Sequence, residues 1–262
     1  LMFAAESCSA ETVKKLIDAG ADIKAVNKFN ANVLMYACQN KDANVAGMLI
    51  NNFDVNAKDA NGWTALLYAA QYGSTLTVKK LLGAGADIKA ASAANKDGLM
   101  CAIKNDNIEV MKMFIDAGAD LVSNRSSLYE TPLTYAVLYC QNTETIKFLV
   151  EQIAKKEKID KYVFETLDHA TINSEFYLMT KEKMQYLNDL AAQTDPNRYK
   201  QFKTTFLANK ASYVDDERII YGLIKDGTDP NGIDSYGQTV LMRAATNKNP
   251  EILEVILEHK VN

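Results

Sequence analysis

From Gly62 to Asp87 the sequence reads GWTALLYAAQYGSTLTVKKLLGAGAD. The triplet that closes this stretch recurs with variation. In the first half of the chain it occurs at steps of about 33 residues: Gly20-Ala21-Asp22, Asn52-Phe53-Asp54, Gly85-Ala86-Asp87 and Gly118-Ala119-Asp120. Near the end of the chain it occurs again, as Gly227-Thr228-Asp229 and Lys260-Val261-Asn262. A fixed period of this size is typical of one supersecondary unit stacked many times. The chain is therefore predicted to be a repeat protein that offers a binding surface, although the period does not identify what binds.

A series of leucines has the same phase and heads short segments that are rich in alanine: Leu1, Leu34, Leu66, Leu99, Leu133, Leu167, Leu207 and Leu241. About twelve residues after most of them comes an apolar triplet such as Val78, Leu81 and Leu82. The spacing i, i+3, i+4 is that of one helix face. Each repeat is thus predicted to be a short helix, a tight turn, an amphipathic helix and a loop, and stacking buries a continuous core.

Glycine and proline mark the ends of these helices. Four glycines follow the second helices, where a left-handed cap suits glycine: Gly20, Gly85, Gly118 and Gly227. Pro250 after Asn249 fits the first helical position behind a capping residue. Asn61-Gly62 predicts a tight turn in a connecting loop.

These residues resemble the ankyrin repeat, whose pattern runs Gly-x-Thr-Pro-Leu-His-x-Ala-Ala, an outer helix, then Leu-Leu-x-x-Gly-Ala-Asp. Residues 62–70 and 81–87 are the best copy, and Thr131-Pro132-Leu133 and Thr239-Val240-Leu241 carry the same turn. The motifs recur in phase over residues 1–121 and 215–262, while between them the resemblance rests on phase and helix pattern. It implies an all-α solenoid of stacked helix-turn-helix units with hairpin-like loops.

The whole chain, 1–262, is expected to be a single ankyrin-repeat domain. The eight leucines divide it into approximate repeats at 1–25, 26–57, 58–90, 91–123, 124–160, 161–198, 199–232 and 233–262. Two central repeats are long: we expect loop markers at Asp160 and Asp195 and second helices near 143–158 and 180–192, a turn or more longer than the others. These repeats are either divergent copies or a specialised partner site. A separate inserted domain is disfavoured because the phase returns at Leu207.

The sequence departs from the family at one position of each repeat. The family histidine is replaced throughout, by Met2, Met35, Leu67, Met100, Thr134, Asp168, Ala208 and Met242. The resemblance assigns this histidine to a polar network between turns, so we expect that network to be missing. Apolar packing would then hold the first helices together, and methionine fills irregular gaps well.

Composition excludes several classes of partner. The net charge of -4 and pI near 5.4 argue against nucleic acid, which would require a basic stripe. No run of 18 apolar residues is present, so no membrane span is expected. Leu1 already lies inside the first helix of a repeat, so we expect a preceding segment to be missing from this sequence.

Cysteine and histidine offer little chemistry. The four cysteines form no C-x-x-C pair, so a disulfide framework and a zinc site are both poorly supported, and small buried thiols are expected: Cys8, Cys38, Cys101 and Cys140. Free thiols weakly favour a reducing compartment such as the cytoplasm. The two histidines, His169 and His259, are interpreted as structural, and no nucleophile elbow or phosphate loop appears. The sequence therefore predicts no enzyme, no catalytic residue, no cofactor and no metal.

The resemblance implies that loop tips and the exposed ends of the first helices form a concave binding face. Carried over by phase, it assigns partner-binding roles to Phe29, Gln39, Asn40, Trp63, Gln71, Tyr72, Lys104, Tyr139 and Tyr236. We interpret Trp63 and Tyr72 as the frame of a common pocket, although such aromatics can also lean on a neighbouring loop and stiffen the stack. Tyr36 and Tyr68, inside the first helices, are interpreted as packing between repeats.

Three functions remain open. The first is a non-catalytic scaffold, expected to be monomeric, that binds a protein partner through its concave face. The second is a targeting region of a larger enzyme or effector whose catalytic part lies outside this chain. The third is a small-molecule or catalytic site in the long repeats, for which a deep polar pocket near Asp168, His169 and Tyr177 would be the sign.

Overall fold

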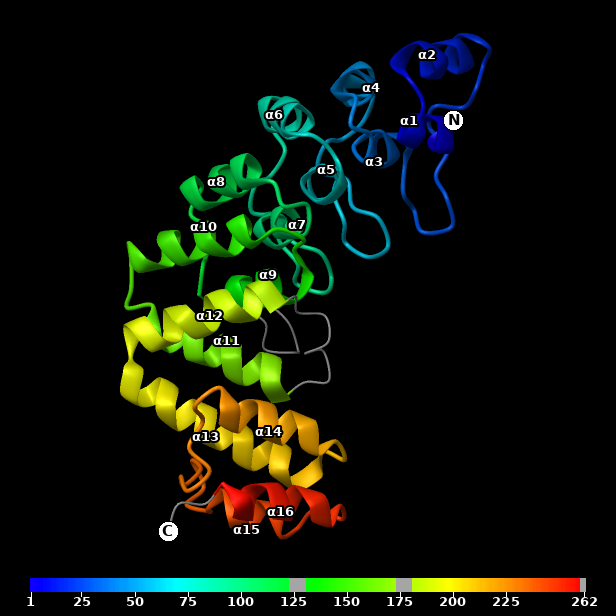
Figure 1. The fold of residues 1–262 in the computed structure, drawn as a ribbon. Helices are drawn as coiled ribbons and strands as arrows, with labels where there is room; N and C mark the ends of the chain where they lie inside the picture. The colour runs from blue at the N-terminus through cyan, green and yellow to red at the C-terminus, as the bar shows by residue number, and fades with distance from the viewer. Residues whose placement is uncertain (123–130, 173–180, 260–262) are drawn as a thin grey trace. The chain divides into compact units, whose positions relative to one another are not determined.

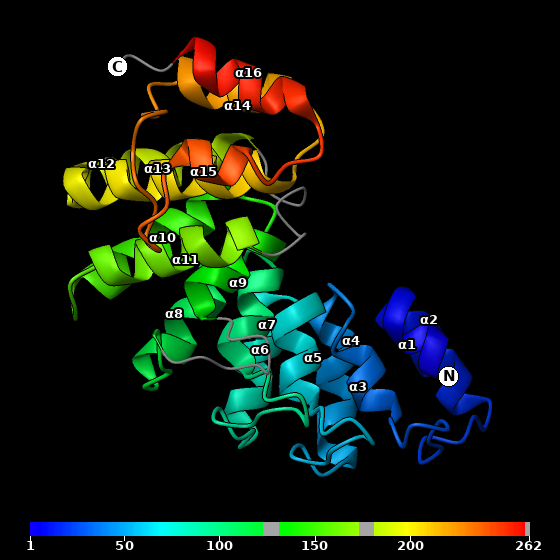
Figure 2. The same ribbon diagram turned by 90° about the horizontal axis from the view of Figure 1, so that it is seen from below.

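The computed structural model describes residues 1–122, 131–172 and 181–259 of the chain. These residues form two compact units, an N-terminal unit of residues 1–157 and a C-terminal unit of residues 158–262, and each is described separately (Figures 1 and 2). Every regular element among them is helical, and the β-structure consists of isolated bridges in loops. The predicted all-α class is therefore confirmed.

The N-terminal unit consists of five successive helix pairs. They are α1 (Met2–Ser7) with α2 (Ala10–Asp18), α3 (Val33–Ala37) with α4 (Ala43–Leu49), α5 (Ala65–Tyr72) with α6 (Thr75–Gly83), α7 (Gly98–Lys104) with α8 (Ile108–Asp116), and α9 (Pro132–Tyr139) with α10 (Thr143–Ala154). A short 3-10 turn, η1 (Ile50–Asn52), follows α4. The first helices of the pairs pack side by side as an inner row, and the second helices form an outer row (Figure 1).

The C-terminal unit contains three further pairs. They are α11 (Asp160–Ile172) with α12 (Lys181–Thr194), α13 (Pro196–Tyr213) with α14 (Glu217–Lys225), and α15 (Val240–Ala244) with α16 (Pro250–Glu258). The core between the last two pairs is aliphatic: Leu207, Ala208, Ala211, Ile220, Val240, Ala244, Ile252 and Ile256. The described residues thus contain eight successive helix pairs.

The predicted helix ends are confirmed. Gly85 adopts φ +87, and the N–H groups of Gly85 and Ala86 donate to the carbonyls of Leu82 and Leu81, the pattern of a left-handed cap. The other three predicted cap glycines also have φ between +82 and +89. Asn249 caps α16 by accepting from Glu251 N–H, with Pro250 at the first helical position.

The leucine phase corresponds to helix position in most repeats. The marker leucine is the second residue of its helix and is buried at Leu34, Leu66, Leu99 and Leu133. In the C-terminal unit, Leu167 and Leu207 instead lie in the middle of α11 and α13. Within the described residues, no helix combines the length and apolar character required to cross a bilayer.

The long repeats confirm one expectation and correct another. Helices α10 and α12 have 12 and 14 residues, whereas the second helices of the other pairs have 7 to 9. Asp160 and Asp195, however, do not mark protruding loops. Asp160 is the first residue of α11, and Asp195 caps α13 by accepting from Arg198 N–H. Asp195-Pro196 is a helix start signal, because proline is preorganised for the first helical position, and the resulting α13 is 18 residues long.

Hairpin-like loops, which we call fingers, lead into α3, α5, α7 and α15. In each finger an N–H donates to the carbonyl four residues on, as from Asp59 to Trp63, over 2.8 to 3.0 Å. The tip residues have left-handed φ values of +58 to +78: Asn30, Gly62, Asn95 and Gly237. In the N-terminal unit the fingers project from the inner row (Figure 1). They are tied together there by Ala60 N–H to the Phe29 carbonyl and Ala93 N–H to the Asn61 carbonyl, both 2.8 Å.

An asparagine after each of three inner helices binds the preceding repeat. The Asn40 side-chain amide donates to the Ala5 and Cys8 carbonyls over 3.0 and 2.9 Å. Asn105 donates in the same way to Ala70 and Gly73. Asn247 donates to the carbonyls of Ala211 and Val214. We call these three residues the asparagine clamps, because each satisfies carbonyls at the end of the previous inner helix.

Candidate functional site

The base of each of the first two fingers is held by one polar side chain. Asp59 Oδ1 accepts from the N–H groups of Asn61 and Trp63 over 2.8 and 2.9 Å. Its Oδ2 accepts from the Tyr68 hydroxyl over 2.7 Å. Tyr68 lies nine residues later on α5, so the carboxylate fixes the finger to its own inner helix.

The same arrangement occurs one repeat earlier with an amide. Asn27 Oδ1 accepts from Phe29 N–H and Ala31 N–H over 2.8 and 3.0 Å. Its amide nitrogen donates to the Tyr36 hydroxyl oxygen over 2.9 Å. Because these side chains satisfy the finger backbone directly, Phe29 is held at a defined position at the tip.

These bonds form a polar network inside each of the two repeats, whereas the network that the sequence predicts to be missing is one between turns. The sequence predicts Tyr36 and Tyr68 to be packing residues, whereas in the structure their hydroxyls bind the finger bases. Burial and the bond to Asp59 raise the pKa of Tyr68, so the hydroxyl stays protonated and donates. The network found here lies within single repeats: a tyrosine nine residues after the finger base binds that base without the family histidine.

A cavity of about 250 Å³ lies between the first two fingers and the inner helices of the N-terminal unit. Its lining comes from three inner helices and two fingers: Glu6, Asn27, Phe29, Ala31, Met35, Tyr36, Gln39, Asp59, Asn61 and Tyr68. Two predicted binding residues, Phe29 and Gln39, are among them. Phe29 is 48% exposed and Gln39 is half-buried, so both are accessible from solvent.

Two further predicted residues are exposed but do not line the cavity. Tyr72 is 41% exposed at the end of α5, and Lys104 is exposed at the end of α7. Trp63 is half-buried, and its ring packs on Tyr68 with centroids 5.0 Å apart. The aromatic residues that line this cavity are Phe29, Tyr36 and Tyr68, and neither Trp63 nor Tyr72 is among its lining residues.

Two of the predicted partner-binding residues, Asn40 and Gln71, have amide side chains and are buried, so the prediction that they are exposed was wrong. Asn40 is 9% exposed because its amide is used as a clamp on the first repeat. Gln71 is 6% exposed because it follows the buried Leu67 by four residues, which places both on one face of α5. Tyr139 is half-buried, with its ring centroid 4.6 Å from that of Tyr135.

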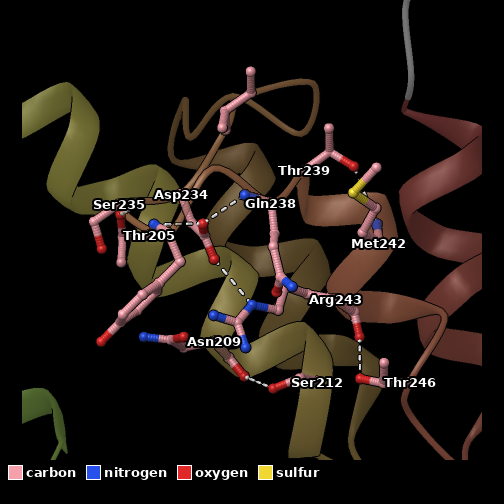
Figure 3. Close-up of polar contacts among 12 residues, drawn as sticks. Thr205, Asn209, Ser212, Asp234, Ser235, Gln238, Thr239, Met242, Arg243 and Thr246 are labelled. Carbon is pink, nitrogen blue, oxygen red and sulfur yellow. Dashed lines mark hydrogen bonds and ion pairs between the residues drawn. The ribbon is translucent and has the colours of Figure 1, made fainter.

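Tyr236 is the predicted residue that belongs to the C-terminal unit. It is highly exposed at a finger tip, and the Arg243 guanidinium lies 5.4 Å from its ring centroid. Asp234, the finger base, accepts from the N–H groups of Tyr236 and Gln238 and from Arg243 Nε over 2.8 to 2.9 Å (Figure 3). Arg243 is nine residues after Asp234 and thus occupies the position of Tyr36 and Tyr68.

The Asp234–Arg243 pair predicts a specific dependence of stability on pH. Burial opposes ionisation of Asp234, but the bonds from Gln238 N–H, Arg243 and Tyr236 N–H outweigh it and lower the pKa below 3.8. A depressed pKa contributes stability that is complete above the unfolded value and disappears as pH falls through the folded value. We expect Asp234→Asn to be less stable than wild type by about 1 kcal/mol at pH 7, with this difference shrinking below pH 3.8.

The measurement is urea denaturation of both proteins at neutral and acidic pH. The exposed Asp215 offers a matched control in the same unit, and Asp215→Asn should change stability little at either pH. An unchanged difference between wild type and Asp234→Asn at acidic pH would contradict the assigned ion pair.

The C-terminal unit has a larger groove of about 500 Å³. Its floor is the aromatic face of α13, with Tyr199, Phe202 and Phe206, and its sides come from α12 and the end of α14. Burial, together with Asp189 and Asp226, raises the pKa of Tyr199. The third candidate function requires a polar pocket near Asp168, His169 and Tyr177, and the side chains of these residues lie outside the described part of the chain.

The thiols are placed as expected in three of four cases. Cys38, Cys101 and Cys140 are buried, whereas Cys8 is half-buried after α1. Burial raises the pKa of Cys101 to about 12, which leaves that thiol protonated and unreactive.

The finger bases and their partners were missed by sequence reasoning. A signal was present: Asn27, Asp59 and Asp234 are each followed nine residues later by a side chain with a donor or hydroxyl group, Tyr36, Tyr68 or Arg243. Glu6, which lies on α1 and lines the cavity, was also missed, because it belongs to none of the recurring motifs.

Comparison with known proteins agrees with this geometry. Family models described as ankyrin repeats match residues 1–92, 76–162 and 236–262. A bovine protein, SMC5-SMC6 complex localization factor protein 1, is 30% identical over 137 residues, which are 50% of this chain and 13% of that protein. Ankyrin repeat domain-containing protein SAT10 of Stachybotrys chartarum is 31% identical over 51% of this chain and 7% of its own length. Human neurogenic locus notch homolog protein 2 is 30% identical over 46% of this chain and 5% of its own length.

The chain thus corresponds to a small part of each of these relatives. The matched segments cover more than half of its residues and include all the fingers of the N-terminal unit described above. Ankyrin repeats serve as protein–protein interaction modules, which agrees with a surface made of fingers and inner helices. The chain is a member of the ankyrin repeat family.

Proposed function

We propose that the finger face of the N-terminal unit, the surface formed by its fingers and inner helices, binds a protein partner without catalysis. The observation that carries this proposal is the cavity between the first two fingers, with the exposed ring of Phe29 at its edge. Aromatic residues beside well-defined pockets are the usual anchors of protein interfaces. The face corresponds to the concave surface that the family resemblance implies, and the protein is proposed to act as a monomer.

A double substitution tests the face. Phe29→Ala with Tyr72→Ala should weaken binding of a captured partner by roughly 2 kcal/mol for each anchor that is a hot spot. Both rings are about half exposed, so their loss should leave the stack folded. The measurement is the affinity of the purified partner for the 262-residue chain, determined by titration calorimetry.

The matched control is Leu76→Ala on the outer helix α6. Leu76 is an exposed apolar side chain of the same unit but lies on the other row of helices. Binding that survives Leu76→Ala but not the double substitution supports the finger face. Equal affinities of all three proteins would direct the search to the outer helices or to the C-terminal unit.

A targeting role within a larger protein is the second candidate, and one observation favours it. The bovine and human relatives that align over residues of this chain are named localization factors, and the aligned part is 13% of each. In such proteins a repeat segment would bring another activity to a partner. Sequencing the complete reading frame separates the two candidates, because a catalytic domain beside these repeats would favour targeting.

A further inference from the structure

We propose that the cavity between the first two fingers receives an arginine side chain of the partner, an inference that rests on the proposed function of the finger face. The size of the cavity limits what can enter. At about 250 Å³ it holds roughly eight water volumes. A helix of about 10 Å diameter does not fit, and small-molecule sites usually exceed about 300 Å³. One long side chain is the occupant that the volume suits.

The charge of the lining selects a cation. Glu6 and Asp59 contribute two carboxylates, and the ten lining residues include no lysine or arginine. Asp59 already accepts three hydrogen bonds, so Glu6, which is half-buried on α1, is the carboxylate with capacity for a new partner. A half-buried carboxylate at the edge of a cavity favours a positively charged group over a neutral one.

The remaining lining favours guanidinium over ammonium. Three aromatic rings, those of Phe29, Tyr36 and Tyr68, border the cavity, and a planar guanidinium stacks on such rings while its edge donates hydrogen bonds. Side-chain carbonyls of Gln39 and Asn61 provide acceptors in addition to Glu6. The Lys28 ammonium lies 4.9 Å from the Phe29 ring centroid, which shows that this ring already interacts with a cation.

The test uses blocked amino acids as probes on the 262-residue chain. Backbone amide resonances are followed while N-acetyl-arginine methylamide is added, and separate titrations use the citrulline, lysine and glutamate equivalents. Citrulline has the shape of arginine without its charge. We expect saturable shifts at Phe29, Gln39 and Asn61 with arginine, and affinity about tenfold lower for citrulline, as for a lost charge-assisted bond.

Charge variants sharpen the result. Glu6→Gln should lower arginine affinity about threefold, and Lys28→Ala should raise it about twofold by removing a like charge. Glu11→Gln is the matched control, because it removes the same charge from the outer helix α2, where Glu11 pairs with Lys15. It should leave arginine affinity unchanged.

Several outcomes would overturn the proposal. They are equal affinity for arginine and citrulline, equal or tighter binding of lysine or glutamate, and no saturable shift at the three residues with arginine. If the probe fails while Phe29→Ala with Tyr72→Ala still abolishes partner binding, the finger face stands and only the arginine anchor is rejected. If both tests fail, the proposed function is rejected with it.

Discussion

Leu66→Ala is expected to lower the free energy of unfolding of the N-terminal unit by about 2–5 kcal/mol. Leu66 is 1% exposed near the start of α5, and α5 packs between α3 and α7. Truncation removes the transfer free energy of the side chain and leaves a cavity that the flanking helices fill only in part. Because α5 packs against the inner helices of both neighbouring repeats, the loss should propagate beyond its own repeat.

Denaturation followed by fluorescence gives a local measurement of this effect. Trp63 is the chain's single tryptophan, and it lies one residue before the cap of α5. The matched control is Leu76→Ala, because Leu76 is 54% exposed in the same repeat and its loss should cost less than about 0.5 kcal/mol. Comparable shifts for the two variants would contradict the assignment of inner and outer faces.

A single added methyl group should be nearly as damaging at Gly73. A Cβ there would lie 2.4 Å from the Cys38 carbonyl oxygen and 2.8 Å from that of Ala69. Both are backbone atoms that cannot rotate away, so Gly73→Ala should cost about 3 kcal/mol, the upper end of the usual range for overpacking. The close approach brings the end of α5 against the preceding inner helix α3.

Gly83→Ala is the matched control for this substitution. Gly83 is the last residue of α6, and a Cβ there meets no atom within 4 Å. Alanine favours helix over glycine, so this variant should gain roughly 0.5–1 kcal/mol. If the melting temperatures of both variants shifted in the same direction, the close contact at Gly73 would be refuted.

The fold could be predicted from sequence because its main determinants are local and periodic. Three kinds of residue recur at a fixed interval: a buried leucine near the start of an inner helix, an apolar triplet on an outer helix and a glycine with positive φ. The repeat from Thr64 to Gly85 contains all three. The long α13 was missed because its aromatic and basic residues follow no such interval. Asp195-Pro196 nevertheless carried the start signal of that helix.

The candidate site was predicted only in part, for a physical reason. Phase placed Phe29 at a loop tip and Gln39 at the end of a first helix, and in the structure both residues line the cavity. Whether an amide is exposed or buried, however, depends on which carbonyls lie within its reach. Asn40 reaches two carbonyls of the first repeat, whereas Gln39, one residue earlier, points toward the cavity. Both residues lie in the turn that follows α3, and a one-residue difference there separates a clamp from a candidate contact.

The asparagine clamps also have a consequence for biosynthesis. Each clamp belongs to the later repeat and bonds carbonyls of the earlier one, as Asn40 does with Ala5, 35 residues before it. On the ribosome, which adds about 5–20 residues per second, the Ala5 carbonyl therefore waits roughly 2–7 s for its partner. At each clamp, the repeat made last is the one whose carbonyls still lack their partner. During synthesis, carbonyls at the C-terminal side of the folded repeats therefore stay unbonded until the next asparagine is made. A pause in translation just before a clamp prolongs the exposure of these carbonyls to chaperones and proteases.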